Sequence, residues 1–329
     1  MPSSSSRVLQ TAIAVGVAGA LCWVGLSFEP ARGERVAWPS VAGTSFPKTV
    51  HHADGADFVL PQPPVRVLIA STTLVDFLTG LLPRERVAAV CAQASTVSTL
   101  ALGATAWRDL PTYDRFATEI VLGFRPDLVL CNGYNDPQTT TALQRVGVPV
   151  VVLPGPASIA DCRRSVSLLG QVLGIEADAA RLVADIDRRV TALQERAGNR
   201  PWRSALCFTH NPTGSWTGGS GTLHDEALRL AGLENAAARR GLRGHGQVTV
   251  EEILAMNPDL LVVDAPVGEG RGSLRFLREN ATLAALPALA SGRVVELHPA
   301  LYSAGSHLVL DAAEAIAAAR RRFFPETKR

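Results

Sequence analysis

The stretch Glu119-Ile-Val-Leu-Gly-Phe-Arg-Pro-Asp-Leu128 decides the fold of this chain, because a second copy of its pattern follows as Glu251-Glu-Ile-Leu-Ala-Met-Asn-Pro-Asp-Leu260. In both copies a glutamate precedes a proline by seven residues, and Pro-Asp-Leu opens an apolar run. The residue before a proline avoids the α-helical region, so a helix that begins near the glutamate ends before the proline. The aspartate then caps the chain or turns it into a strand. One such unit in each half of the chain predicts two similar lobes.

Short apolar runs alternate with amphipathic segments around both copies of the repeat. In the first half, the expected strands are 65–70, 87–90, 128–130 and 150–153, and the expected helices are 75–82, 118–124 and 137–146. In the second half, the expected strands are 204–209, 260–263 and 294–297, and the expected helices are 223–231, 250–256, 273–279 and 306–323. This alternation is typical of parallel sheets covered by helices, so we predict an α/β fold. Ahead of it, Asp54-Gly55 between two short β-like runs predicts a hairpin.

The segment 158–200 has no strand-like run and carries apolar residues at helical spacing. A helix of about 40 residues would span roughly 60 Å, which is longer than either lobe needs. We therefore expect this segment to bridge the lobes, with Gly170 and Gly174 as the positions where the helix can bend or break.

The N-terminus differs from the rest of the chain. Residues 8–28 contain no charged side chain, and as a helix they would match the thickness of a bilayer core. We expect residues 1–28 to be a secretory signal or a membrane anchor and residues 29–45 to be a linker. Cys22 lies in the apolar run, but Leu21 precedes it where a lipoprotein cleavage site requires a small residue. Either interpretation places the bulk of the chain in the periplasm or elsewhere outside the cytoplasmic membrane, and the anchor interpretation attaches it to the membrane through this segment.

Glu119 and Glu251 occupy the first turns of their expected helices, where the helix dipole favours an anion. In the second copy, Thr249 and Glu252 also predict a capping box. Taken singly, each glutamate is explained as a helix-start residue. Carboxylates at matching positions on two similar lobes instead suit a dimeric partner that presents basic residues to each lobe.

At these residues the sequence resembles the class III periplasmic binding proteins, which serve ABC importers of cobalamin, ferric siderophores and haem. The resemblance covers residues 46–325 and includes Phe46-Pro-Lys-Thr-Val50, both copies of the repeat, the long helical segment, and Asn211-Pro212 followed by Gly218-Gly219. It implies two Rossmann-like lobes with parallel sheets joined by a long rigid helix. The implied boundaries are 46–157 for the N-terminal lobe, 158–200 for the bridging helix and 201–329 for the C-terminal lobe. It also implies that Glu119 and Glu251 pair with arginines of an ABC permease dimer.

The resemblance places a small-molecule ligand in the cleft between the lobes, against aromatic and polar side chains on loops. The matching loops carry Tyr113, Trp216, His245 and Tyr302. Aromatic faces bind flat or bulky ligands by stacking. Further candidates follow the first strand, at the edge where open α/β sheets bind ligands, or lie in other loops: Ser71, Thr72, Thr73, Tyr134 and Arg243. For each of these side chains, packing or plain surface exposure is the alternative explanation.

The resemblance implies a corrinoid or a ferric chelate such as a siderophore as the ligand. Tyr113 and His245 stand where the cobalamin-importer pattern has tryptophans, and both residue types serve as axial ligands of haem iron. A haem-binding protein of a haem importer is therefore the alternative, although tyrosine and histidine are also ordinary hydrogen-bonding pocket residues.

Charge and motifs weigh against other functions. The net charge of +2 gives no basis for binding nucleic acid. An α/β enzyme is the main rival class, but no Gly-x-Gly-x-x-Gly occurs in a strand-to-helix context, and no Gly-x-Ser-x-Gly elbow occurs. We therefore expect no catalytic residue and no cofactor. The five cysteines and the adjacent His51-His52 form no metal-binding pattern, so no metal site is expected. An anchored ligand sensor is a third possibility, and it would need a signalling partner.

Overall fold

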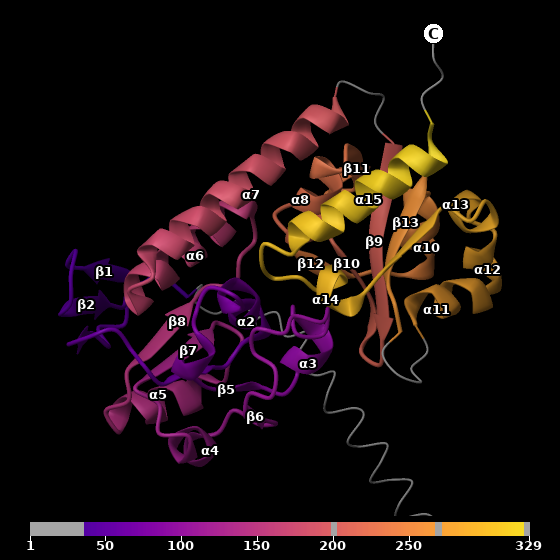
Figure 1. Cartoon of the computed structure of the whole chain (residues 1–329). Helices are drawn as coiled ribbons and strands as arrows, with labels where there is room; N and C mark the ends of the chain where they lie inside the picture. The colour runs from indigo at the N-terminus through magenta and orange to yellow at the C-terminus, as the bar shows by residue number, and fades with distance from the viewer. Residues whose placement is uncertain (1–35, 199–202, 267–271, 326–329) are drawn as a thin grey trace, which may run out of the picture.

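The computed structural model describes residues 36–198, 203–266 and 272–325, and Figure 1 shows two α/β lobes with a long helix beside them. The signal or anchor predicted over 1–28 lies outside the described residues. Within the described part of the chain, no helix is long and apolar enough to cross a membrane.

Five parallel strands form the sheet of the N-terminal lobe. In spatial order they are β6 (Thr112–Tyr113), β5 (Val87–Cys91), β4 (Val67–Ile69), β7 (Leu128–Asn132) and β8 (Val150–Leu153). The helical segments of this lobe are α2 (Thr72–Leu78), the 3₁₀ turn η2 (Arg84–Arg86), α3 (Ala94–Val97), α4 (Thr118–Gly123) and α5 (Pro137–Arg145). The central strands β4 and β7 are buried along their whole length, which is why they appear in the sequence as continuous apolar runs.

A small antiparallel sheet precedes this lobe. It consists of β1 (Ser40–Ala42), β2 (Lys48–His51) and β3 (Phe58–Leu60), and the predicted hairpin turn at Gly55 has a φ of 75°. The ammonium group of buried Lys48 donates to the carbonyl oxygen of Gln171 at 2.8 Å and pairs with the carboxylate of Glu176. This sheet is thereby fastened to the helices that follow the lobe.

Two helices occupy the segment predicted to be one bridging helix over 158–200. Helix α6 (Ile159–Leu173) ends at Gly174, whose φ of 68° is left-handed, and α7 (Glu176–Ala197) begins two residues later. A left-handed glycine ends a helix, so Gly174 breaks the predicted single helix. A Cβ atom at Gly170 would lie 2.6 Å from that of Ala179, so the glycine lets α6 and α7 pack closely.

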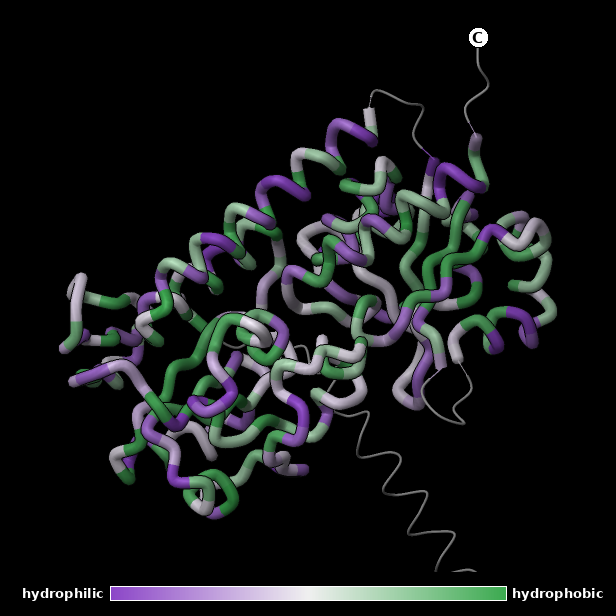
Figure 2. The backbone as a smooth tube through the Cα atoms, viewed as in Figure 1, coloured by the Kyte–Doolittle hydropathy of each residue, from purple (hydrophilic) through white to green (hydrophobic). Residues whose placement is uncertain are grey.

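Helix α7 is the long helix that joins the lobes. It packs on α6 and reaches the C-terminal lobe, where the Arg189 guanidinium bonds to Asp311 and Glu314 at 3.1 and 3.0 Å. Polar and apolar residues alternate along it, as Figure 2 shows, because one face packs on the lobes and the other meets solvent.

The C-terminal lobe contains a six-stranded sheet. Its main path runs β12 (His245–Gln247), β10 (Gly214–Gly218), β9 (Arg203–Asn211), β13 (Leu260–Asp264) and β14 (Val294–Leu297), and β11 (Leu233–Asn235) also pairs with β9. Strands β9, β13 and β14 are parallel, as predicted, and β11, which the sequence did not predict, also runs parallel to β9. Strands β10 and β12 add an antiparallel edge, which the sequence did not predict. The helices are α8 (Leu223–Leu230), α9 (Ala236–Arg239), α10 (Val250–Met256), α11 (Ser273–Glu279), α12 (Ala281–Ala284), α13 (Pro287–Ala290), α14 (Pro299–Tyr302) and α15 (Val309–Phe323).

The two copies of the repeat end their helices in the same way. Arg125 and Asn257, the residues before the two prolines, have φ angles of 47° and 40°. These are the left-handed values that an α-helix cannot continue through, so α4 and α10 both end there.

The aspartates of the repeat hold the neighbouring strands. Asp127 accepts hydrogen bonds from the backbone N–H groups of Val65 and Arg66 at 2.7 and 2.9 Å, just ahead of β4. Asp259 accepts one from the N–H of Ser204 at 2.8 Å, at the start of β9. Each aspartate therefore fixes where the adjacent strand enters its sheet.

Candidate docking and ligand-binding residues

The two glutamates of the repeat lie at corresponding, exposed positions in the first turns of α4 and α10. The predicted capping box is present: the Thr249 hydroxyl accepts from the N–H of Glu252 at 3.2 Å, and the Glu252 carboxylate accepts from the N–H of Thr249 at 2.8 Å. Hydrogen bonds from its own backbone N–H and from Thr249 lower the pKa of Glu251. Glu251 is therefore ionised at neutral pH.

A polar network lies at the carboxyl ends of β4 and β7. The amide of Asn132 donates to the hydroxyl of buried Ser71 at 2.7 Å, and the amide of Asn135 donates to the carbonyl oxygen of Ala70 at 2.8 Å. Thr72, the next predicted contact, is half-buried at the start of α2. Sequence reasoning named Ser71 and Thr72 but missed the two asparagines, although polar residues directly after the run 128–131 were a signal for them.

Tyr113 lies in the interior of the N-terminal lobe. Its side chain is 6% exposed, and its hydroxyl donates to the carbonyl oxygen of Ile69 at 3.2 Å. Burial raises the pKa of this phenol above its usual value. This placement favours packing over the ligand contact that the sequence predicted.

Trp216 and His245 lie on adjacent antiparallel strands, β10 and β12. The Trp216 indole N–H donates to the hydroxyl of Thr213 at 3.1 Å, and His245 is exposed opposite Gly218. The ring of His245 meets that of His224 edge-on, with centroids 5.5 Å apart. The structure thus brings these two predicted residues onto one edge of the C-terminal sheet.

A second aromatic group, formed by His210 at the end of β9 and Phe276 on α11, was not predicted from the sequence. The ring of His210 stacks on Phe276 with centroids 3.7 Å apart, and its Nδ1 lies 3.0 Å from the hydroxyl of Ser215. Burial lowers the pKa of His210 and raises that of the nearby carboxyl of Asp264. Both residues stand at the carboxyl ends of their strands, the position where the sequence could have signalled them.

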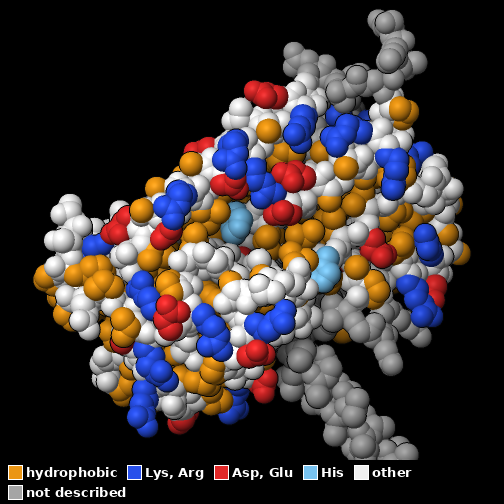
Figure 3. All heavy atoms as spheres, viewed as in Figure 1, with side chains coloured by type: hydrophobic (Ala, Val, Ile, Leu, Met, Phe, Trp, Pro, Cys, Tyr) orange, Lys and Arg blue, Asp and Glu red, His pale blue; other side chains and the backbone are white. Residues whose placement is uncertain are grey.

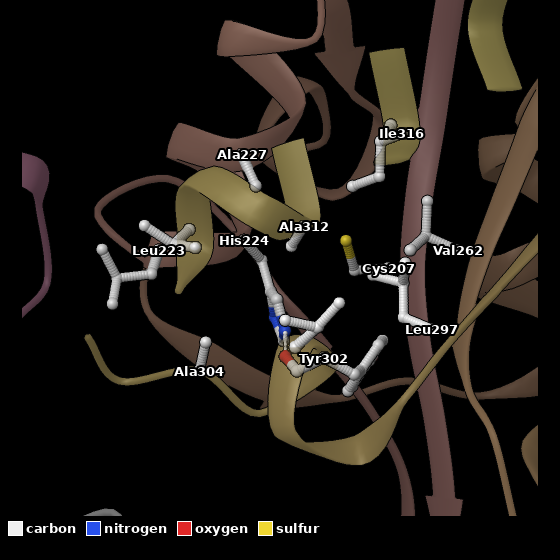
Figure 4. A pocket seen from close by; sticks show the side chains of 12 residues that line it. Cys207, Leu223, His224, Ala227, Val262, Leu297, Tyr302, Ala304, Ala312 and Ile316 are labelled. Atoms are coloured by element: carbon white, nitrogen blue, oxygen red, sulfur yellow. Dashed lines mark hydrogen bonds between the residues drawn. The ribbon is translucent and has the colours of Figure 1, made fainter. Parts of the chain in front are cut away.

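Tyr302 lies beneath the surface of the C-terminal lobe, beside a cavity of about 10 Å³ (Figure 4). This is about the space that a single buried water molecule needs. The His224 Nε2 lies 2.8 Å from the Tyr302 carbonyl oxygen, and burial lowers the pKa of His224 to about 4. The Tyr302 hydroxyl and the His224 Nδ1 are buried without hydrogen-bond partners in the described part of the chain. Tyr302 is therefore an interior residue in this structure.

A larger hollow of about 440 Å³ lies between α6, α7 and α8. It is lined in part by charged residues that pair with each other, such as Arg163 with Asp187 at 2.5 Å and Arg229 with Glu226 at 3.7 Å. None of the predicted ligand residues lines it. On the face drawn in Figure 3, positive and negative side chains are interspersed around this bridging region.

Residues 91–301, which include both copies of the repeat, match the family described as periplasmic binding protein. The chain belongs to this family. Its members bind ligands, so the prediction of a binding protein rather than an enzyme is confirmed.

Known relatives of this periplasmic binding protein agree with the resemblance seen in the sequence. A cobalamin-binding protein of Halobacterium salinarum is 26% identical over 219 residues, which are 66% of this chain and 58% of that protein. The chain thus spans less than two thirds of that relative. An uncharacterized ABC transporter substrate-binding lipoprotein of Bacillus subtilis is 21% identical over 295 residues, which are 86% of this chain and 87% of that protein. A solved periplasmic heme binding protein from Pseudomonas aeruginosa has a TM-score of 0.69 at 23% identity, over 80% of this chain and 94% of that one, and shows the fold alone.

Proposed function

We propose that this periplasmic binding protein captures a corrinoid or a ferric chelate between its lobes and delivers it to the permease dimer of an ABC importer. The observation that carries the proposal is the pair of exposed glutamates, Glu119 and Glu251, at corresponding positions on the two lobes. The cobalamin-binding relative supports the ligand class, and the Bacillus subtilis relative supports delivery to an ABC transporter.

The glutamates differ from the aspartates of the repeat, since Glu251 bonds within its own helix start and not to a neighbouring strand. Asp127 and Asp259 of the same repeat bind the neighbouring strands, whereas Glu119 and Glu251 face solvent. Exposed carboxylates attract basic groups of a partner and give an association its orientation. Two of them, one on each lobe, match a partner with two-fold symmetry.

The proposed ligand contacts come from both lobes. Trp216 and His245 offer an aromatic face and an imidazole on the edge of the C-terminal sheet, and His210 on Phe276 offers a second ring. Ser71 and Thr72 offer hydroxyl groups at the end of β4. Tyr113 and Tyr302 support the lobes from within, and haem ligation through Tyr113 would require its hydroxyl to leave the carbonyl oxygen of Ile69.

We propose that the N-terminal segment 1–28 exports the chain and holds it at the outer face of the cytoplasmic membrane. The lipoprotein relative supports attachment to the membrane. The proposed location is therefore periplasmic or extracytoplasmic.

A titration of the full chain with cyanocobalamin, haemin and a ferric hydroxamate tests the ligand class. We expect one of them to bind with a dissociation constant of about 1 μM or lower, that is, at least about 8 kcal/mol of binding free energy, and to be recovered unchanged. A Trp216→Ala variant should weaken that binding about tenfold through lost stacking, whereas Trp107→Phe, deep in the N-terminal lobe, should leave it unchanged in folded protein. No binding to any of the three would overturn the ligand class.

A further inference from the structure

Two segments far apart in the sequence meet where the lobes touch. Asp76 on α2 of the N-terminal lobe accepts a hydrogen bond from the hydroxyl of Ser306 at 3.0 Å, and Ser306 precedes α15 of the C-terminal lobe. Beside this bond, the rings of Phe77 and His307 stack with centroids 5.8 Å apart. We name this contact the lobe junction. Its residues are Thr73, Asp76, Phe77, Gly305, Ser306 and His307.

The lobe junction is tightly packed. A Cβ atom at Gly305 would lie 2.5 Å from the hydroxyl oxygen of Thr73, so a larger residue there would force the Thr73 side chain or the segment itself to shift. Asp76 is 2% exposed and Ser306 is fully buried. The contact therefore excludes water from an ionisable side chain.

The carboxylate of Asp76 has donors on both lobes. Thr99 of the N-terminal lobe donates to it from its backbone N–H and its hydroxyl, each at 2.7 Å, and Ser306 donates from the C-terminal lobe. Burial outweighs these bonds and raises the pKa of Asp76 from 3.8 to about 6. If the lobes moved apart, the bonds from Thr99 would remain, and water would replace Ser306.

His307 supplies a second ionisable group at the lobe junction. Its Nδ1 is buried and has no hydrogen-bond partner within the described residues. Burial lowers the pKa of this imidazole. A charge on His307 is therefore disfavoured as long as the junction stays closed.

We propose that the lobe junction is a proton-controlled clamp that sets how far the two ligand-binding lobes separate. This proposal rests on the proposed function in one respect: it takes the space between the lobes as the ligand site. The clamp is tightest when Asp76 and His307 are both neutral, because neither then holds a charge away from water.

The two groups respond to pH in opposite directions. Closing raises the pKa of Asp76, so lower pH favours the closed junction through this carboxyl and higher pH favours separation. Closing lowers the pKa of His307, so lower pH favours separation through this imidazole. The two effects oppose each other at acidic pH, and Asp76 is the group that favours closing as the pH falls.

Within the described residues, one thiol and three charged side chains also act on the two ionisable groups of the lobe junction. Cys91 on β5 interacts with Asp76, and burial raises the pKa of its thiol to about 11, which keeps it neutral. The charged groups that face His307 are Asp185 and Arg189 on α7 and Asp311 on α15. Arg189 is held in ion pairs with α15, so it stays charged throughout the relevant range.

The distance between spin labels on the two lobes tests the clamp in the full, ligand-free chain. Exposed positions on α5 and α11 carry the labels through Arg145→Cys and Arg278→Cys, and the chain without these substitutions controls for labelling of the native cysteines. Between pH 5.5 and 7.5, a pKa that rises from 3.8 to about 6 on closing shifts the ratio of short to long distances about fourfold toward the short ones at pH 5.5, relative to Asp76→Asn, which keeps His307 but lacks the carboxyl.

Two variants separate the clamp from a merely structural contact. Asp76→Asn keeps an oxygen for Thr99 and offers an N–H to Ser306, so it should keep the junction closed and leave the response of His307, which favours separation at pH 5.5. Ser306→Ala should lengthen the distance at both pH values. A wild-type pH response equal to that of Asp76→Asn would overturn the proposal, because the carboxyl of Asp76 would then have no part in it. Because no ligand is added, failure of the ligand titration would leave this result standing, and the reverse also holds.

Discussion

The two copies of the repeat are alike where they build the sheet and differ where they begin the helix. In both, a left-handed residue ends the helix and an aspartate binds the start of the neighbouring strand. Helix α10 begins with the capping box of Thr249 and Glu252, whereas α4 begins at Ala117 without a side-chain cap. In the second copy, Thr249 and Glu252 already cap the helix, and a further glutamate is still present at position 251. Its recurrence is better explained by a partner outside the chain than by the needs of a helix.

Substitutions in the Pro-Asp-Leu part, which both copies share, should have the larger effect on stability. Asp127→Ala and Asp259→Ala each remove a carboxylate that holds backbone N–H groups of an adjacent strand. We expect each to lower the free energy of unfolding by about 1–3 kcal/mol, the range for hydrogen bonds to charged groups. Urea unfolding measures this, with Asp114→Ala on the exposed surface as the control. Equal stability of all three variants would show that the shared half is not what fixes the strands.

The helix starts, where the two copies differ, should contribute smaller effects on the free energy of unfolding, and these effects should have opposite signs in the two copies. Thr249→Ala should destabilise the protein by about 1 kcal/mol, because it removes a helix cap. Ala117→Ser should instead stabilise it by about 0.5 kcal/mol, because α4 gains a cap that it lacks. Thermal unfolding compares both with Ser167→Ala, an exposed position on α6. A loss of stability in Ala117→Ser would contradict this view of the helix starts.

Much of the fold follows from local patterns in the sequence. The runs that became β4, β7 and β13 are continuously apolar because those strands are buried on both faces. The two-residue strand β6 is too short to leave a pattern. Strands β10 and β12 carry Gly and polar residues, since they form an edge of the sheet, and the alternation of apolar runs did not reveal them.

The candidate site was harder to predict, because a loop residue can turn outward or inward with the same sequence around it. Trp216 and His245 lie at the sheet edge, whereas Tyr113 and Tyr302 turn inward and fill their lobes. The hydrogen bond between Asp76 and Ser306 joins residues 230 positions apart, so no local sequence pattern could have predicted it. The exposed positions of Glu119 and Glu251 at helix starts were predictable because the repeat itself marks them, and their docking role stays a prediction.

The most direct test of the account is ligand uptake by cells that carry Glu119→Arg and Glu251→Arg together, with the ligand affinity of the purified double variant measured alongside and Glu195→Arg on α7 as the control. Reversed charges should repel a basic partner at both lobes while the ligand residues stay intact. We expect uptake to fall at least about tenfold, equivalent to about 1.4 kcal/mol, whereas the ligand affinity of the double variant and the uptake of the Glu195→Arg control remain unchanged. Normal uptake by the double variant, or loss of ligand binding in the purified protein, would contradict it.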